Sequence, residues 1–500
     1  MTSSLSALDS LSLLKRILPT LFWLMAAIAV GVVITSQPPG AVIIILVVTT
    51  LGVLAFVSPV AAAITLLILA PLRTLIATEA RLQLPLDIGQ FWLLIFVFVW
   101  VAYWVAHGHQ IVESFRSPIT AVILIYIIVI GFTAFGAVSV GAWLNEWLKW
   151  LQILILIAFV LNFAWERRWE WLLFGLTISA AANALVGIYE FFGGSGALHL
   201  VIDGRFFRAF GTFGQPNPFG GFMGLIIPLT LMAAVGYAWR AYDQWCVLCR
   251  KSLICSSLFL SCFYVLASVI VLIGMVMSWS RGAWVGLLGA LLVVSLVLPR
   301  RVWRGIVLFG GICGLAILLW SIGLVPRSIL ERLNTSTQEF FAFEDVRGID
   351  ITPENYAVVE RLAHWQAAIN MAASSPWLGV GLGNYEVAYP VYRLINWQEP
   401  LGHAHNYYLN LFAESGVIGL LVYGKVWVII IVVSWWARRH PDRVVRFVVI
   451  GLMGSWTYLS IHSLFDNLYV NNLFLHIGLM FGILAVLYNQ SRTHITLGIS

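Results

Sequence analysis

Long apolar runs, each about as long as a helix that crosses a bilayer, dominate the chain. A bilayer core requires about 20 apolar residues per helix, and about 14 such runs are present. They lie near residues 17–35, 41–58, 60–77, 88–106, 118–138, 147–164, 169–192, 218–239, 256–279, 283–299, 305–324, 416–436, 444–463 and 471–488. The second and third share a break at Ser58-Pro59 and could form a tight pair or one re-entrant element. The pattern predicts an all-α polytopic membrane protein with about 12–14 transmembrane helices.

The composition agrees with this pattern. Hydrophobic residues make up 61% of the chain and charged residues only 10%, and the mean hydropathy is +0.94. A globular domain carries about 25% charged residues, so soluble, disordered, collagen-like and disulfide-scaffold classes are excluded. Cys246 and Cys249 form a C-x-x-C without the second pair or nearby His that a zinc site needs.

The distribution of positive charge predicts the orientation, because cytoplasmic loops of membrane proteins are rich in Lys and Arg. With the N-terminus in the cytoplasm, 16 of the 28 Lys and Arg residues lie inside and ten outside. Lys149 and Lys425 lie within or at the edge of spans. Both termini are then cytoplasmic. The run after Lys15-Arg16 is interpreted as an uncleaved first span, because it is long and no A-x-A-like site follows it.

Two segments on the outer side stand apart from the short connections. Residues 193–217 are rich in glycine, and 325–404 form an 80-residue insertion, a length at which loops are usually functional or disordered. A helix is predicted in the insertion, with an N-cap at Thr352-Pro353 and an end at Pro376. Its apolar face comprises Val358, Leu362, Trp365, Ile369 and Ala372. We therefore expect a small helical cap over the outer mouth of the bundle.

The chain is accordingly divided into four regions. They are N-terminal transmembrane helices (1–192), a central transmembrane region with arginine-bearing outer loops (193–324), a large extracytoplasmic loop domain (325–404) and C-terminal transmembrane helices (405–500).

Three arginines on the outer side are the first candidate site residues. Arg281 stands between two apolar runs at the outer membrane boundary, where a charge is costly and indicates function unless it is an interfacial anchor. Arg205 and Arg208 lie on the same side, just before the next span. Because the guanidinium fork pairs with phosphate, the three arginines predict an anionic ligand at the outer leaflet.

The second candidate is the segment GHAHNYYLNLFAESGVIG, residues 402–419, where the large loop meets the next span. His405 can take up a proton near neutral pH and serve as a general base. If a helix begins there, Glu414 lies roughly opposite and has a packing role. His403 and His405 alone make a weak metal site without a carboxylate, so no metal or other cofactor is expected.

Other features carry less weight. The glycines of WLGVGLGNYE (377–386) are interpreted as a turn rather than a nucleotide loop. His364 follows Glu360 by four residues and is expected to form a surface pair with it. Asp466 could equally orient a catalytic group or cap a helix.

Together these residues resemble the O-antigen ligase and Wzy-type polymerase superfamily. The resemblance rests on His405-Asn406 followed by Gly416, on Glu360-Arg361 with Trp365, and on three tracts. The tracts are RAFGTFGQPNPFGG (208–221), SWSRGAWVG (278–286) and SSPWLGVGLGNYE (374–386). The resemblance covers roughly residues 200–420, and the first 190 residues match only as apolar spans.

The resemblance implies a GT-C-type, metal-independent glycosyltransferase of the bacterial inner membrane with its active site on the extracytoplasmic face. Such enzymes pass a glycan from an undecaprenyl-diphosphate carrier to a hydroxyl group. That hydroxyl belongs to a glycan, to a lipid-linked acceptor or to a protein. His405 would be the general base, and Arg281 and Arg208 would bind the diphosphate. Arg361 would assist near the acceptor or the diphosphate, and His403 and Asn406 belong to the motif.

The chemistry of the residues agrees with that role. Departure of a diphosphate needs preorganised positive partners, and one base serves the attacking hydroxyl. With base and leaving group on opposite faces of the sugar, the reaction would invert the anomeric centre. The alternatives to a glycosyltransferase are a multi-span polysaccharide or lipid transporter and a membrane scaffold. If the protein is a glycosyltransferase, it could be a ligase, a polymerase or an enzyme that glycosylates proteins. No nucleic-acid partner is expected.

Overall fold

The computed structural model describes residues 49–496 apart from 51, 80–86, 108–115, 164–166, 195–196, 203, 249–250, 300, 324–344 and 353–354. Among these residues, eleven helices are long and apolar enough to cross a membrane. A shorter apolar helix covers Arg281–Val297. Each of the twelve runs predicted from residue 60 onward corresponds to one of these helices. The predicted span 17–35 and most of 41–58 lie outside the described residues.

The bundle is built from helices in a simple order. The first part comprises α3 (Pro59–Leu69), η1 (Ala70–Leu72), α4 (Arg73–Glu79), α5 (Ile88–His107), α6 (Pro118–Gly131), η3 (Phe132–Gly136), α7 (Val140–Phe163), α8 (Trp169–Tyr189) and η4 (Glu190–Gly194). The second part comprises η5 (Leu198–Leu200), β1 (Val201–Ile202), β2 (Phe206–Phe207), η6 (Gly211–Phe213), α9 (Pro216–Leu248), α10 (Lys251–Met277), α11 (Arg281–Val297) and α12 (Val302–Ser321). The last comprises α14 (Tyr356–Ser374), α15 (Tyr385–Tyr392), α16 (Tyr407–Ala437), α17 (Arg443–His462) and α18 (Leu473–Thr496). The two short strands pair antiparallel.

Local capping explains where several helices begin. Ser58 accepts a hydrogen bond from Ala61 N with Pro59 at the first helical position, so the Ser58-Pro59 break is the start of α3. Ser117 and Pro118 repeat this arrangement at α6. At α17 the Asp442 carboxylate accepts hydrogen bonds from Val444 N and Val445 N. Side chains of the polar connections thus satisfy amide groups that have no partner inside the helix.

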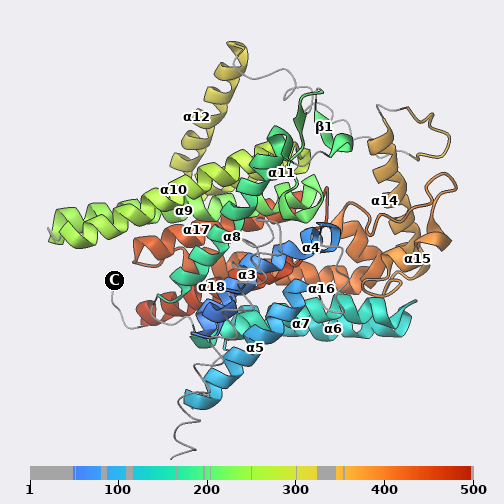
Figure 1. The fold of residues 1–500 in the computed structure, drawn as a ribbon. Helices are drawn as coiled ribbons and strands as arrows, with labels where there is room; N and C mark the ends of the chain where they lie inside the picture. Colours follow the sequence, from blue (N-terminus) through green and yellow to red (C-terminus); the bar gives the residue numbers. More distant parts are fainter. Residues whose placement is uncertain are drawn as a thin grey trace, which may run out of the picture.

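The helices assemble with α9, α17 and α18 at the centre. More than three quarters of the residues in each of their spans are buried inside the protein. Helix α9 packs on α10 and α17, α18 packs on α7, and α16 packs on α6 and α18. By contrast, only 6% of the α12 span is buried, and Figure 1 shows α12 standing away from the bundle. The prediction of an all-α polytopic membrane protein is confirmed.

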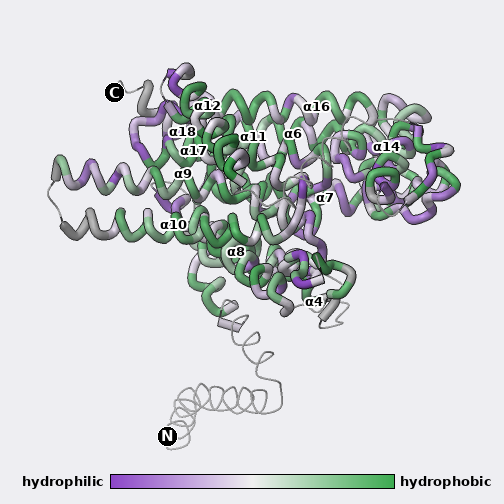
Figure 2. The backbone as a smooth tube through the Cα atoms, turned by 90° about the horizontal axis from the view of Figure 1, so that it is seen from above, coloured by the Kyte–Doolittle hydropathy of each residue, from purple (hydrophilic) through white to green (hydrophobic). Residues whose placement is uncertain are grey.

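Helices α14 and α15 form a helical cap at one end of the bundle, beside the ends of α6 and α16 (Figure 1). Figure 2 shows hydrophilic positions gathered around α14, whereas the bundle helices are largely hydrophobic. The predicted cap helix is present, assigned from Tyr356 rather than from Pro353. The Thr352 carbonyl already accepts a hydrogen bond from Tyr356 N, and the Thr352 hydroxyl accepts one from Asn355 N.

Two small hydrophobic clusters stabilise this cap. In one, Trp365 and Leu362 of α14 pack with Val346 and Trp397. In the other, Ala368 and Met371 of α14 pack with Tyr385 and Tyr389 of α15 and with Ala413 of α16. Helix α14 is therefore buried on more than the single face that the apolar spacing predicts, because α15 and α16 cover its other side.

Candidate active site

The turn at residues 402–406 brings both motif histidines to the junction of the cap and the bundle. Its backbone is held from several sides: Ala404 N donates to Asn410 Oδ1 (3.1 Å), and Tyr407 N donates to the Ser463 carbonyl (2.8 Å). Asn406 caps α16 by accepting from Leu409 N (3.1 Å). His405 has φ +52°, a left-handed conformation that costs free energy in a residue other than glycine. The surrounding hydrogen bonds therefore hold the backbone of His405 in one defined conformation.

Three side chains of this region converge. His403 Nδ1 accepts a hydrogen bond from His405 N (3.0 Å), so in the neutral ring the proton is on Nε2. That Nε2 lies 3.4 Å from Asp466 Oδ1, and His405 Nδ1 lies 3.9 Å from the same oxygen. Asp466 follows the end of α17, is 3% exposed, and also accepts from Asn467 N. Of its two roles left open by the sequence, a position beside the histidines is the one observed.

The electrostatic environment favours a neutral imidazole beside an ionised carboxylate. Burial lowers the pKa of His405 to about 3; His403 and Arg361 act in the same direction, and Asp466 opposes them. Burial also lowers the pKa of His403. For Asp466 burial alone would raise the pKa, but the histidines around it hold that pKa below its usual value. A neutral His405 can accept a proton, and the carboxylate stabilises the imidazolium that results.

Two further cations belong to the surroundings of this cluster. Arg361 of α14 is close enough to lower the pKa of both motif histidines. Lys149 of α7 has the same effect on His403, and its ammonium group donates to the Tyr469 carbonyl and contacts Glu146. The sequence predicts a role for Arg361. It places Lys149 only at the edge of a span, and no local pattern around that residue indicates its proximity to His403.

The expected surface pair of Glu360 and His364 is wrong. His364 is 1% exposed, its Nδ1 lies 2.9 Å from the Tyr385 hydroxyl, and its ring stacks on Tyr389. Its centroid is 5.9 Å from that of His405. Glu360 instead accepts a hydrogen bond from the Tyr356 hydroxyl. The four-residue spacing cannot reveal that α15 covers the side of α14 on which His364 lies.

The connection between α10 and α11 contacts Arg208 and ends at Arg281. The Arg208 guanidinium donates to the carbonyls of Ser278 (3.1 Å) and Trp279 (3.5 Å) and to Asn217 Oδ1 (3.3 Å). Ala209 N donates to the Met277 carbonyl, so the 208–209 backbone runs along this connection. The same connection ends at Arg281, the first residue of α11.

A chain of contacts links this connection to the histidine cluster. A Cβ on Gly282 would be 3.0 Å from Phe465 Cβ and 3.5 Å from His462 Nδ1. The residue after Arg281 therefore packs against the segment that leads to Asp466. Arg205, by contrast, is exposed in the turn between β1 and β2, and its guanidinium lies over the Phe206 ring.

The glycine-rich turn of 377–383 interlocks with a break in α16. Gly416 has φ +63° and ψ −166°, and there Val417 N donates to the Pro376 carbonyl. Any Cβ on Gly416 would lie 2.4 Å from the Trp377 carbonyl oxygen, and one on Gly379 would lie 2.5 Å from the Ala413 carbonyl oxygen. Glu414 accepts from Tyr385 N (3.0 Å), as the predicted packing role requires. Through these contacts the turn packs directly against α16, the helix that follows His405.

The cluster also has the composition of a metal site. One ligand atom from each of His403, His405 and Asp466 lies within 4.8 Å of the others. The reason given above against a metal, the lack of a carboxylate partner, is therefore wrong. Two features still disfavour a cation: Arg361 and Lys149 contribute positive charge nearby, and His403 Nε2 already points its proton at the carboxylate.

The fold and the cluster define a polytopic helical membrane protein whose cap covers a His-His-Asp group with arginines in the adjoining segments. Residues 266–424 match the family model described as O-antigen ligase, which confirms the resemblance and supports membrane glycan transfer as the general function. The match includes Arg281, Arg361, His403, His405 and Asn406, and it excludes Arg205, Arg208 and Asp466. No curated protein matches the chain significantly.

Proposed function

We propose that the protein is a membrane glycosyltransferase that transfers or polymerises a glycan from an undecaprenyl-diphosphate donor onto a hydroxyl acceptor. The reaction takes place on the extracytoplasmic face of the bacterial inner membrane, inverts the anomeric centre and needs no metal. His405 is the general base, in a bundle of the GT-C type. The four-region division of the chain stays part of this proposal.

One observation carries the proposal: the buried Asp466 carboxylate stands 3.9 Å from His405 Nδ1 in the turn that carries the family motif. No hydrogen bond to His405 Nε2 occurs among the described residues, and the side chain is 21% exposed. That nitrogen is available to an acceptor hydroxyl. Once His405 takes the proton, its positive charge lies beside a carboxylate, which offsets part of the cost of charging a buried imidazole.

The diphosphate is assigned to the arginines. Arg208 donates to two carbonyl oxygens and one amide oxygen, and these contacts hold the guanidinium in place. Arg281 begins α11 directly after the connection to which Arg208 is bonded. The negative charge that develops on the leaving diphosphate would be stabilised by such prepositioned cations. Arg205, in the hairpin turn, would contact the same group from the side, and Arg361 would assist at the acceptor.

The cap supplies the remaining requirement, exclusion of water from a donor that could otherwise hydrolyse. Helix α14 packs against α16 and places His364 beside His405, and Tyr385 and Tyr389 of α15 contact His364. His403 and Asn406 are positioning residues in this account: the first donates toward Asp466, and the second caps the helix that follows the base.

The test is transfer in vitro from a purified polyprenyl-diphosphate glycan by the full chain in proteoliposomes, read as product length. We expect His405→Ala and Arg281→Ala to lower the rate by about 10²–10⁴-fold each, the usual contribution of a general base or a charge clamp. Arg304→Ala is the matched control, since Arg304 lies in the first turn of α12, after the end of α11 that is opposite to Arg281, and its guanidinium lies over the Trp303 ring. Wild-type activity of His405→Ala would reject the mechanism.

A chelator arm separates the two uses of the histidine cluster. Undiminished transfer in chelator is expected if His405 acts as a base. Activity that a chelator removes and Zn²⁺ restores would instead assign His403, His405 and Asp466 to a metal. Vectorial uptake of lipid-linked glycan without product formation would favour the transporter alternative.

A further inference from the structure

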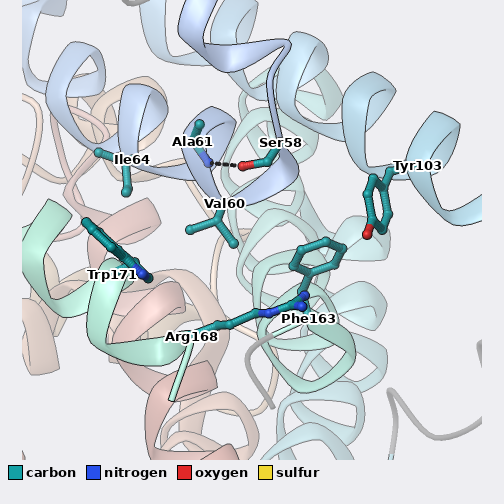
Figure 3. Close-up of a pocket in the computed structure, with 8 residues that line it drawn as sticks. All are labelled: Ser58, Val60, Ala61, Ile64, Tyr103, Phe163, Arg168 and Trp171. Atoms are coloured by element: carbon teal, nitrogen blue, oxygen red, sulfur yellow. Dashed lines mark hydrogen bonds between the residues drawn. The ribbon is translucent and has the colours of Figure 1, made fainter. Parts of the chain in front are cut away.

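We infer that a cavity at the end of the bundle remote from the histidine cluster binds an anionic phospholipid. The acyl chain lies in the cavity, and the phosphate lies against the Arg168 guanidinium. The cavity has a volume of about 500 Å³, within the range of about 300–1,000 Å³ that is typical of ligand pockets. Figure 3 shows it between Ile64 and Trp171 on one side and Phe163 and Tyr103 on the other.

Its place in the fold is the opposite end of the helices from the cap. Phe163 is the last residue of α7, Arg168 directly precedes α8, and Ser58 directly precedes α3. The other end of α7 contacts the cap, because Ser139 N donates to Asn384 Oδ1. In the proposed orientation the cavity therefore opens at the inner leaflet, where anionic lipids are concentrated.

The lining combines an apolar interior with one cation. Val60, Ile64 and Phe163 provide aliphatic and aromatic surface, and Trp171 is 60% exposed at the rim. Arg168 lies over the Phe163 ring, with 5.6 Å between its Cζ and the ring centroid. Among the described residues Arg168 forms no ion pair, whereas its neighbour Arg167 pairs with Glu170 at 2.6 Å.

This combination selects one class of ligand. A soluble anion would leave the apolar interior unused, and a zwitterionic lipid would bring its own cation to the arginine. An anionic phospholipid fills the cavity with hydrocarbon and offers its phosphate to the guanidinium fork. The exposed Trp171 at the rim is typical of the membrane interface.

The experiment is lipid titration of the delipidated full chain, with bound lipid counted by native mass spectrometry. The probes are phosphatidylglycerol and phosphatidylcholine with the same acyl chains. Wild type is expected to retain one phosphatidylglycerol preferentially, and Arg168→Gln to weaken that retention about tenfold, the loss of one charge-assisted contact. Arg167→Gln, which removes the same charge one residue away, should retain the lipid as wild type does.

A cavity-filling variant tests the second half of the inference. Ala61→Phe places a ring inside the cavity and should reduce retention of the anionic lipid; Ile64→Phe replaces it if that variant does not fold. The inference is overturned if Arg167→Gln and Arg168→Gln behave alike, if both lipids bind equally to wild type, or if filling the cavity changes nothing.

A photoreactive residue at Trp171 should crosslink to added phosphatidylglycerol, and a crosslink within the chain instead would contradict the assignment.

Discussion

Two groups of charged residues, one at each end of the bundle, are held in different ways. At the end away from the cap, Arg240 contacts two carboxylates, Asp442 at 3.0 Å and Glu170 at 3.5 Å. Arg443 pairs with Asp243 at 2.7 Å. At the cap end, Arg208 is held by two carbonyls and an amide oxygen, and the Asp466 carboxylate faces histidines. The first arrangement pairs opposite charges between helices, and the second holds a guanidinium on neutral oxygens and a carboxylate beside imidazoles.

This difference indicates which charges serve the fold and which serve a ligand. An arginine between carboxylates links α8, α9 and α17 and has little electrostatic attraction left for an anion. Hydrogen bonds to neutral oxygens orient a guanidinium, whose planar fork matches the geometry of a phosphate. Equivalent substitutions at the two ends should therefore affect stability at one end and transfer at the other.

The largest contrast is expected between two aspartates. Asp466→Asn removes the charge that stabilises protonated His405 and should lower the transfer rate about 100-fold or more. Asp442→Asn keeps a side chain able to cap α17 and should lower the free energy of unfolding by about 1 kcal/mol with transfer per folded molecule unchanged. Single-turnover transfer and thermal unfolding of both variants measure this. Equal transfer by the two variants would remove the distinction between the ends.

Two arginines provide the next contrast. Arg208→Ala should lower kcat/KM for the lipid-linked donor by about 10–100-fold, the equivalent of about 1.5–3 kcal/mol for a charged hydrogen bond. Arg240→Ala leaves Glu170 and Asp442 without their shared partner, so it should lower the unfolding temperature and leave the donor KM unchanged. Initial rates at varied donor concentration check both, and an unchanged donor dependence in Arg208→Ala would contradict its assignment.

Two glycines in α16 test whether the contact between the cap and the break in this helix contributes to stability. Gly416→Ala forces a side chain into a left-handed conformation against the Trp377 carbonyl and should cost about 1–3 kcal/mol of stability. Gly424→Ala, on the same helix with nothing within 4 Å of the added Cβ, should be neutral or stabilising. Thermal unfolding distinguishes them, and a stable Gly416→Ala protein would show that the break in α16 is dispensable.

The smallest effect concerns pH. Burial lowers the pKa of His364 to about 4 and that of His405 to about 3. The unfolded chain therefore binds protons below about pH 6.5 that the folded protein does not, and stability falls as the pH decreases from 6.5 toward 4. At pH 5.5 each histidine should contribute about 1 kcal/mol to this loss. Unfolding of His405→Gln at pH 7.5 and 5.5 should show a smaller decrease than wild type; an identical decrease would contradict the pKa shift of His405.

The helices were accessible from the sequence because each apolar run of bilayer length has one stable solution, a helix. The cap helix followed from the spacing of Val358, Leu362 and Trp365. The site was only partly accessible. The motif pointed to His405, but its nearest carboxylate, Asp466, is 61 residues further along the chain.

Long-range packing accounts for the features that the sequence did not predict. Asp466 reaches the histidines because α17 returns beside the start of α16, where Tyr407 N bonds to the Ser463 carbonyl. His364 is buried because α15 folds back over α14. Neither contact has a periodic signature, so only the arrangement of the helices reveals them.

The most direct test of the account is a structure of the full chain with a polyprenyl-diphosphate glycan bound in a lipid nanodisc. The diphosphate is predicted to lie against the guanidinium groups of Arg208 and Arg281, with the anomeric carbon turned toward His405. A diphosphate bound at another face, or separated from His405 by the cap, would contradict the proposal that these arginines and this histidine act on one substrate.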